Sequence, residues 1–242
     1  SSVAYSNWKY NYSRDTNSEN ELGFSKFDVP HRLMAQLSYT TPKYLNGWTS
    51  TTISVIYNGF SGSRYSLTMN EVSDFNGDGQ KGNSLLYIPT EAEMDNMNFV
   101  DYTDQKTGKL IMSAADSRKA FTEWVNNDDY AKNHRGQYAE RNSNLSNWEH
   151  EIDLHLAQTI YNAQGLGKLE FTFDIINFAN MLNKKWGASY SSAYNLSPLT
   201  VVSLSTDENG NRNPGYAFNN AKINKSDISS RWHAQVGIRL TF

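Results

Sequence analysis

The last eleven residues, WHAQVGIRLTF, alternate strictly between two kinds of side chain. Apolar or aromatic residues occupy every second position from Trp232 to Phe242, and polar or small residues lie between them. A period of two predicts a β-strand with unlike faces, because successive side chains of a strand point to opposite sides. In a soluble sandwich the apolar face would pack in a core, whereas in an outer-membrane barrel it would face lipid and the polar face would line the lumen. This strand alone leaves both architectures open.

Five further segments have the length of strands that cross a bilayer at a tilt, about 9–11 residues each. They cover residues 2–12, 31–39, 52–60, 151–161 and 169–178. Along the later strands, charged and polar residues alternate with large apolar ones, a pattern that predicts a polar, lumen-facing side. The residues predicted to lie on that side are Glu151, Asp153, His155, Glu170, Asp174 and Arg239.

The connections between these strands alternate between short and long. Residues 40–50 and 162–168 are short turns, and the long connections cover 13–30, 61–150 and 179–231. Outer-membrane barrels have short periplasmic turns and long extracellular loops, so a periplasmic C-terminus would place all of these connections consistently. Within the long connections, the pattern predicts a short helix over 113–127 and an additional hairpin over 199–219, lying above the membrane.

Composition excludes several classes of protein. No apolar run reaches the roughly 18 residues of a transmembrane helix. The absence of cysteine excludes disulfides, thiolate zinc sites and cysteine nucleophiles, and the net charge of −3 argues against a nucleic-acid partner. Neither a phosphate-binding P-loop nor a G-x-S-x-G serine motif occurs, so we expect no enzyme. Asp153 and His155, two residues apart on one strand face, are the remaining candidates for a catalytic pair.

The segment DFNGDGQKGN, residues 74–83, contains a D-x-N-x-D-G pattern. Asp74, Asn76 and Asp78 are spaced so that a tight turn aims their oxygens at one calcium ion. The twelfth position is Leu85 rather than the bidentate glutamate of an EF-hand. The alternative is a turn rich in Asn, Asp and Gly that binds no metal. Calcium in this loop is the only cofactor that the sequence suggests.

Several segments together resemble the C-terminal end of TonB-dependent outer-membrane receptors, of the Bacteroidetes type that carries an N-terminal carboxypeptidase-regulatory-like domain. They are RGQYAERNSNLSNWEHEIDLHLAQ (135–158), FDIINFANMLNKKWG (173–187) and SRWHAQVGIRLTF (230–242). DFNGDGQKGNSLLYIP (74–89) and FDVPHRLMAQLSY (27–39) fit the same pattern, so the resemblance covers nearly the whole chain in order.

The resemblance implies an all-β fold, an antiparallel transmembrane β-barrel of about 22 strands filled by a plug domain. This chain would supply the last six to eight strands, with the plug and the TonB-binding segment outside it. The implied function is TonB-driven uptake of a scarce nutrient (a glycan, a peptide or a chelated metal) across the cell outer membrane of a Gram-negative bacterium. The implied partners are the rest of the barrel and its plug, the TonB complex, the barrel assembly machinery, outer-membrane lipid and, in some receptors of this type, a surface lipoprotein.

The resemblance also gives the terminal strand a role in assembly. The family's terminal aromatic residue is read by the barrel assembly machinery, and this role carries over to the apolar face of the last strand. The residues concerned are Trp232, Val236, Ile238, Leu240 and Phe242. Independently of the family, a final strand must pair at an open edge to close a barrel.

Two other readings stay open at this point. One is a complete small outer-membrane barrel with a structural or adhesive role, which would show a closed lumen of eight strands. The other is a secreted β-sandwich binding module, which would be soluble without detergent and would pack its apolar strand faces on one another.

Overall fold

The chain divides into two compact units in the computed structural model. The sheet unit comprises Val29–Gly62, Ser146–Ser191 and Asn224–Phe242, and the core unit comprises Ser1–Asp28, Ser63–Leu145 and Ser192–Ile223. The structure describes residues 3, 10–15, 22–104, 106–161, 165, 167–190 and 194–242. Strands outnumber helices in both units, so the expected all-β class is confirmed.

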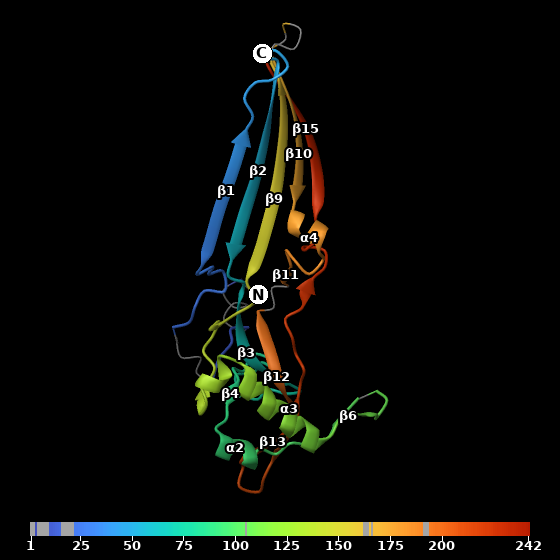
Figure 1. Cartoon of the computed structure of the whole chain (residues 1–242). Helices are drawn as coiled ribbons and strands as arrows, with labels where there is room; N and C mark the ends of the chain where they lie inside the picture. Colours follow the sequence, from blue (N-terminus) through green and yellow to red (C-terminus); the bar gives the residue numbers. More distant parts are fainter. Residues whose placement is uncertain are drawn as a thin grey trace. The chain divides into compact units, whose positions relative to one another are not determined.

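The sheet unit is organised around one five-stranded antiparallel sheet (Figure 1). Its order is β1 (Arg32–Thr40), β2 (Thr49–Phe60), β9 (Glu149–Ile160), β10 (Lys168–Ile176) and β15 (His233–Thr241). The short helix α4 (Phe178–Leu182) follows β10, and β11 (Ser189–Tyr190) pairs with β14 (Lys225–Ser226). Each outer strand, β1 and β15, pairs on one side only within the described residues, so the sheet is open and no closed barrel is present there.

The strand ends that flank the two short connections lie at the same end of the sheet as the C-terminus (Figure 1). The register pairs Thr40 with Thr52, Thr49 with Ile160, and Lys168 with Thr241. The turn after β1 contains three consecutive residues of positive φ that end in Asn46 and Gly47, which tolerate that conformation well. The assignment of this end to the periplasm stays a prediction.

The core unit contains a second sheet, of order β13 (Arg212–Phe218), β12 (Asn195–Thr206), β3 (Arg64–Glu71) and β8 (Asn144–Leu145). Its remaining elements are β4 (Tyr87–Ile88), α2 (Glu91–Asn96), β5 (Tyr102–Thr103), β6 (Leu110–Met112), α3 (Ala114–Asn127), η1 (Ala131–Asn133) and β7 (Gln137–Tyr138). The five-stranded sheet is antiparallel throughout, as expected, whereas this second sheet is mixed because β3 and β12 pair in parallel. Their long connection allows this, since parallel neighbours need a crossover.

A conventional hydrophobic core fills this unit. Phe121 and Val125 of α3 are fully buried and belong to the same cluster as Leu67 of β3 and Val201 of β12. The helix begins where the sequence predicts, because the Ser113 side chain accepts a hydrogen bond from the backbone N–H of Asp116. Most of the long connection over 61–150 is therefore folded, and it shares its interior with residues of β12.

Most predicted elements are confirmed with shifted ends. The strands expected over 31–39, 52–60, 151–161 and 169–178 correspond to β1, β2, β9 and β10, and the hairpin expected within 199–219 corresponds to β12 and β13. The hairpin belongs to the core unit rather than to the five-stranded sheet.

The strand expected over 2–12 falls largely outside the described residues. Its described positions, 3 and 10–12, are not in strand conformation, so that expectation is wrong for them. Ser13, just beyond, forms an isolated parallel bridge with Ser84. Among the helices that the structure describes, none has both the length and the apolar character needed to cross a membrane.

Candidate functional site: a two-faced sheet and a loop-lined cavity

One face of the five-stranded sheet carries a continuous apolar band. Residues directly opposite each other in an antiparallel register share a face. The register therefore places two rows of large side chains across all five strands. These rows are Tyr39, Ile53, Leu156, Phe173 and Val236, and Leu37, Val55, Leu154, Ile175 and Ala234.

The exposure of the two faces is the reverse of that in a soluble sheet. On β2, the apolar Ile53 and Val55 are 43% and 40% exposed, whereas Ser54 between them is 4% exposed. On β15, Val236 and Ile238 are 73% and 70% exposed. Soluble sheets bury their apolar face and solvate the polar one. On β2 the polar side is thus sheltered and the apolar side is open, whereas Ile175 of β10, on the same apolar face, is buried.

The polar face is a ladder of paired side chains. The Ser38 and Ser54 hydroxyls lie 2.7 Å apart, and the His155 Nδ1 atom is hydrogen-bonded to the Asp174 carboxylate. Asp153 accepts the backbone N–H of Asn177 at 2.8 Å. These partly sheltered polar side chains therefore have hydrogen-bond partners in the sheet or, for Asp153, just beyond the end of β10.

Charged pairs continue this ladder toward the short-turn end. Glu170 pairs with Lys168 at 3.1 Å and with Arg239 at 3.6 Å. Glu151 lies on the same face, opposite Asn58. The structure thus brings all six residues predicted to face a lumen onto one side of the sheet, and the lumen itself stays a prediction.

The register also aligns Ser54, His155 and Asp174 in one row, the residue types of a hydrolytic triad. The Ser54 hydroxyl is hydrogen-bonded to Ser38, and within the described residues it makes no bond to His155. Asp153 and His155, the catalytic pair suggested by the sequence, do not bond to each other. Asp153 accepts the backbone N–H of Asn177, and His155 is hydrogen-bonded to Asp174. A serine nucleophile needs the neighbouring base to take its proton. This row therefore has the composition of a triad without its connectivity.

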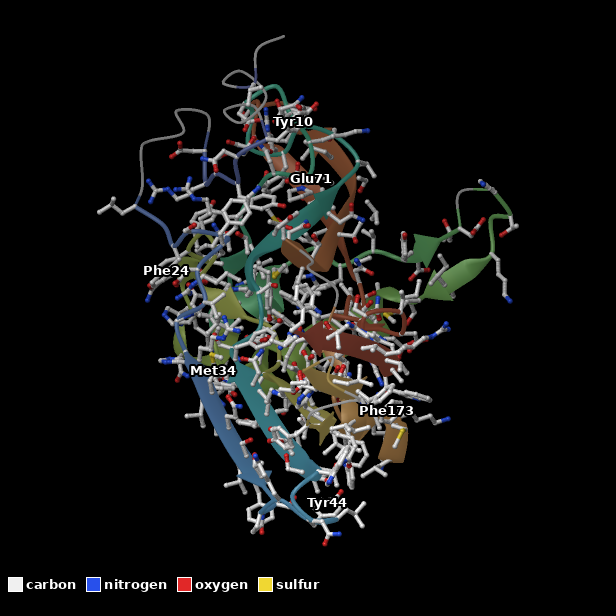
Figure 2. The ribbon with its side chains drawn as sticks, turned by 90° about the horizontal axis from the view of Figure 1, so that it is seen from above. Tyr10, Phe24, Met34, Tyr44, Glu71 and Phe173 are labelled. Carbon is white, nitrogen blue, oxygen red and sulfur yellow. The ribbon has the colours of Figure 1, made fainter. Side chains whose placement is uncertain are left out.

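Exposed aromatic residues lie at both ends of the sheet. Trp48 lies at the short-turn end with Tyr44 of the turn (Figure 2), and Phe242 follows β15 there. Trp148 and Trp232 lie at the opposite end, immediately before β9 and β15. Aromatic residues at two levels are typical of strands that cross both interfaces of a membrane.

The predicted assembly residues lie on the open face or at the ends of β15. Trp232, Val236, Ile238, Leu240 and Phe242 are all at least 46% exposed. The edge of β15 that faces away from β10 has no partner among the described strands. Their role in assembly stays a prediction.

The core unit contains a cavity of about 650 Å³. Its lining includes Tyr10, Tyr12, Lys26, Arg141, Asn142 and Tyr194. The Lys26 ammonium lies 4.8 Å from the centre of the Tyr194 ring, a cation–π contact. Burial raises the pKa of the Tyr12 hydroxyl, which therefore stays protonated and able to donate at neutral pH.

Arg64 holds the segment that forms one wall of this cavity. Its guanidinium donates to the Asp28 carboxylate at 2.7 Å and to the Asn142 carbonyl oxygen at 3.2 Å, and it stacks on the Phe24 ring at 3.9 Å. Arg64 is only 7% exposed, so this pairing is a sheltered, charge-assisted contact. Sequence inspection missed Arg64 because no motif surrounds it.

The loop over 74–83 adopts a compact turn built on its acidic residues. Asp74 accepts the backbone N–H groups of Gly77, Asp78 and Gly79, at 2.6, 3.1 and 2.9 Å. Asn76 donates to Asp78 at 3.2 Å, so the three predicted ligands do lie within one loop. In the part of the chain that the structure describes, no three acidic, histidine or cysteine side chains are gathered as a metal cluster.

Comparisons with protein-family models, with curated proteins and with solved structures find no match to this chain. We therefore infer function from the residues and geometry of this chain alone.

Proposed function

We propose that this chain is the C-terminal part of the barrel of a TonB-dependent outer-membrane receptor. The observation that supports the proposal is the five-stranded sheet whose apolar face is open while its polar face is sheltered and internally paired. In water such an arrangement is unfavourable, because each square ångström of apolar surface left exposed loses about 25 cal/mol of hydrophobic stabilisation. In a bilayer it is the expected arrangement.

The open edges of the sheet favour a part of a larger barrel over a complete small one. Both β1 and β15 lack an outer partner among the described residues. Unpaired strand edges within lipid leave backbone N–H and C=O groups without hydrogen bonds, which is why membrane-spanning sheets close into barrels. The proposal therefore requires further strands, supplied by the rest of the receptor.

The core unit is proposed to act outside the membrane as part of the ligand-contacting surface. It has its own buried interior and a cavity lined by tyrosines, asparagines and the cations Lys26 and Arg141. Aromatic rings stack on sugar rings or peptide side chains, and cations bind carboxylates. A glycan or peptide that carries an acidic group fits this lining. We propose no catalytic step.

The test is purification of the chain from outer-membrane fractions in mild detergent, followed by mass determination of the native and denatured material. The proposal predicts that the chain travels with the remainder of a larger receptor, and that the complex requires detergent. A chain that is alone in detergent and changes its gel mobility on heating is a small barrel. A chain that needs no detergent is a soluble module, and either of these results overturns the proposal.

A further inference from the structure

Glu71, at the end of β3, has an unusual environment for a carboxylate. It is 7% exposed, and its Oε2 atom accepts the backbone N–H groups of Phe75 at 3.4 Å and Gly82 at 3.2 Å. Its Oε1 atom is buried without any hydrogen-bond partner, and no lysine or arginine pairs with it in the described part of the chain. Burying a carboxylate without a balancing positive charge is strongly unfavourable.

Asn83 repeats this pattern on the other side of the loop. It is 3% exposed, and its Nδ2 atom donates to the Asp78 carboxylate at 2.6 Å. Its Oδ1 atom is also buried without a partner. Two unpaired oxygens, one of them charged, thus belong to residues that are hydrogen-bonded directly to the same loop. Both atoms are acceptors, which a bound cation or a hydrogen-bond donor satisfies.

The loop has the residue spacing of the first half of a calcium-binding turn. Asp74, Asn76 and Asp78 occupy the first, third and fifth positions, and Gly79 at the sixth has φ +84°. In EF-hand loops a glycine at the sixth position permits the sharp turn, and oxygen ligands come from the first, third and fifth positions. The twelfth position, which carries a bidentate glutamate in EF-hands, is Leu85 here.

We propose that this loop binds one calcium ion, and that Glu71, upstream of the loop, supplies the carboxylate that Leu85 cannot. Asp74, Asp78, Asn76 and Asn83 provide the remaining side-chain oxygens. Three acidic side chains are not gathered in the described residues, and the amide N–H groups of Asn76 and Asn83 donate to Asp78. The proposal therefore requires these two amides to turn so that their oxygens face the ion. The absence of thiol and imidazole groups among these residues selects a hard, oxygen-seeking cation over zinc.

Calcium binding would also organise one wall of the cavity. The Ser13 hydroxyl donates to Asp78 at 3.3 Å, and the backbone of Ser13 bonds to Asn83 and Leu85 at 3.0 and 2.9 Å. The segment that contains Ser13 carries Tyr10 and Tyr12 into the cavity lining. The ion therefore fixes the segment that positions these two tyrosines. Calcium binding itself does not depend on the proposed receptor function.

The experiment is a calorimetric titration of the full chain, stripped with a chelator and held in mild detergent, with calcium chloride. We expect one ion per chain, and at least a tenfold weaker affinity in Glu71→Gln. The matched control is Asp207→Asn, which alters an exposed loop aspartate that also accepts backbone N–H groups, from Asn209 and Asn211, and has no unpaired buried oxygen. This control should bind calcium as the wild type does.

Thermal unfolding with and without calcium separates the ion site from a merely structural role. In chelator, Glu71→Gln should be at least as stable as the wild type, because the substitution removes an unpaired buried charge. Calcium should raise the unfolding temperature of the wild type and leave that of Glu71→Gln unchanged. Should Glu71→Gln fail to fold, Asp78→Asn takes its place. No saturable binding by the wild type, or equal binding by wild type and the folded variant, overturns the proposal.

Discussion

Strands β2 and β3 follow each other in the chain and meet opposite surroundings. In β3 every residue except Asn70 is buried, and its Leu67 belongs to a core shared with α3 and β12. In β2 the large apolar residues of the strand centre are exposed and the serine between them is buried. The comparison shows that the core unit buries its apolar residues in an interior of its own, whereas β2 leaves its central apolar residues exposed. Under the proposed function, lipid would cover these exposed residues.

The largest effect is expected from truncating the core. Phe121 has no exposed surface, and Phe121→Ala should destabilise the core unit by about 3–5 kcal/mol, since it removes buried apolar contacts and leaves a cavity. Phe173 of the sheet is 39% exposed, and Phe173→Ala should have a much smaller effect. Denaturant unfolding of each variant measures the difference. Equal effects at the two positions would contradict the contrast between the units.

The second prediction concerns an exposed position at which a substitution should be strongly destabilising, although surface substitutions usually change stability little. Val236 is 73% exposed near the middle of β15, yet Val236→Lys should destabilise the chain in lipid by about 2–4 kcal/mol. The matched control is Gln235→Lys on the opposite face, where the lysine would face Asp174. Folding in lipid vesicles, followed by denaturant titration, compares them. If Val236→Lys changes stability by less than about 0.5 kcal/mol, as surface substitutions in water do, the open face is water-facing.

A third prediction concerns the core unit at high pH. Burial raises the pKa of Tyr65 to about 12 and that of Tyr216 to about 12. A raised pKa means that the folded state holds the proton more tightly, so stability is fully present below the ordinary value of 10.0 and is lost as pH rises toward 12. For the 8%-exposed Tyr65 the loss is on the order of 2 kcal/mol.

Tyrosinate absorbance and circular dichroism across this pH range test the prediction together. The core unit should lose structure as these two hydroxyls ionise, and Tyr65→Phe should lessen the loss. Ionisation of all tyrosines near pH 10, with no loss of structure, would show that neither hydroxyl is held in the core.

The smallest effect is expected at the start of α2. Thr90 and Glu93 form a capping box, in which each side chain bonds the other residue's backbone N–H. Thr90→Ala should destabilise the core unit by about 1 kcal/mol. Hydrogen bonding to Thr90 and Tyr87 lowers the pKa of Glu93, so the contribution of the box is lost only as pH falls through that lowered pKa. Amide hydrogen exchange in α2 measures both effects, and unchanged exchange in Thr90→Ala at neutral pH would exclude a stabilising cap.

The strands of the sheet were predictable because apolar and polar residues alternate along each of them. β3, in contrast, is buried along both faces, and its sequence RYSLTMNE has no period of two. No strand was therefore predicted there, and the segment fell within the long connection over 61–150. Its parallel pairing with β12 depends on tertiary packing that local patterns do not encode. The helix α3 and the β12–β13 hairpin were predictable, because Ser113 and the DENGN turn are local signals.

The same distinction applies to the candidate sites. The polar ladder could be predicted residue by residue, because strand alternation determines which side chains share a face. The cavity could not, since Tyr12, Lys26 and Tyr194 are brought together only by the fold. Glu71 was missed because a calcium motif is read downstream from its first aspartate, whereas this carboxylate comes from the strand upstream.

The most direct test of the central claim is the environment of alternate residues along β15 and β2. The chain has no cysteine, so a nitroxide label can be attached at single introduced cysteines without background. With the chain in outer membranes, labels at Val55, Val236 and Ile238 should be accessible to dissolved oxygen and protected from a water-soluble nickel chelate. Labels at Ser54 and Gln235 should show the opposite preference. If labels on the apolar face are instead accessible to the chelate, that face lies in water and the membrane account is wrong.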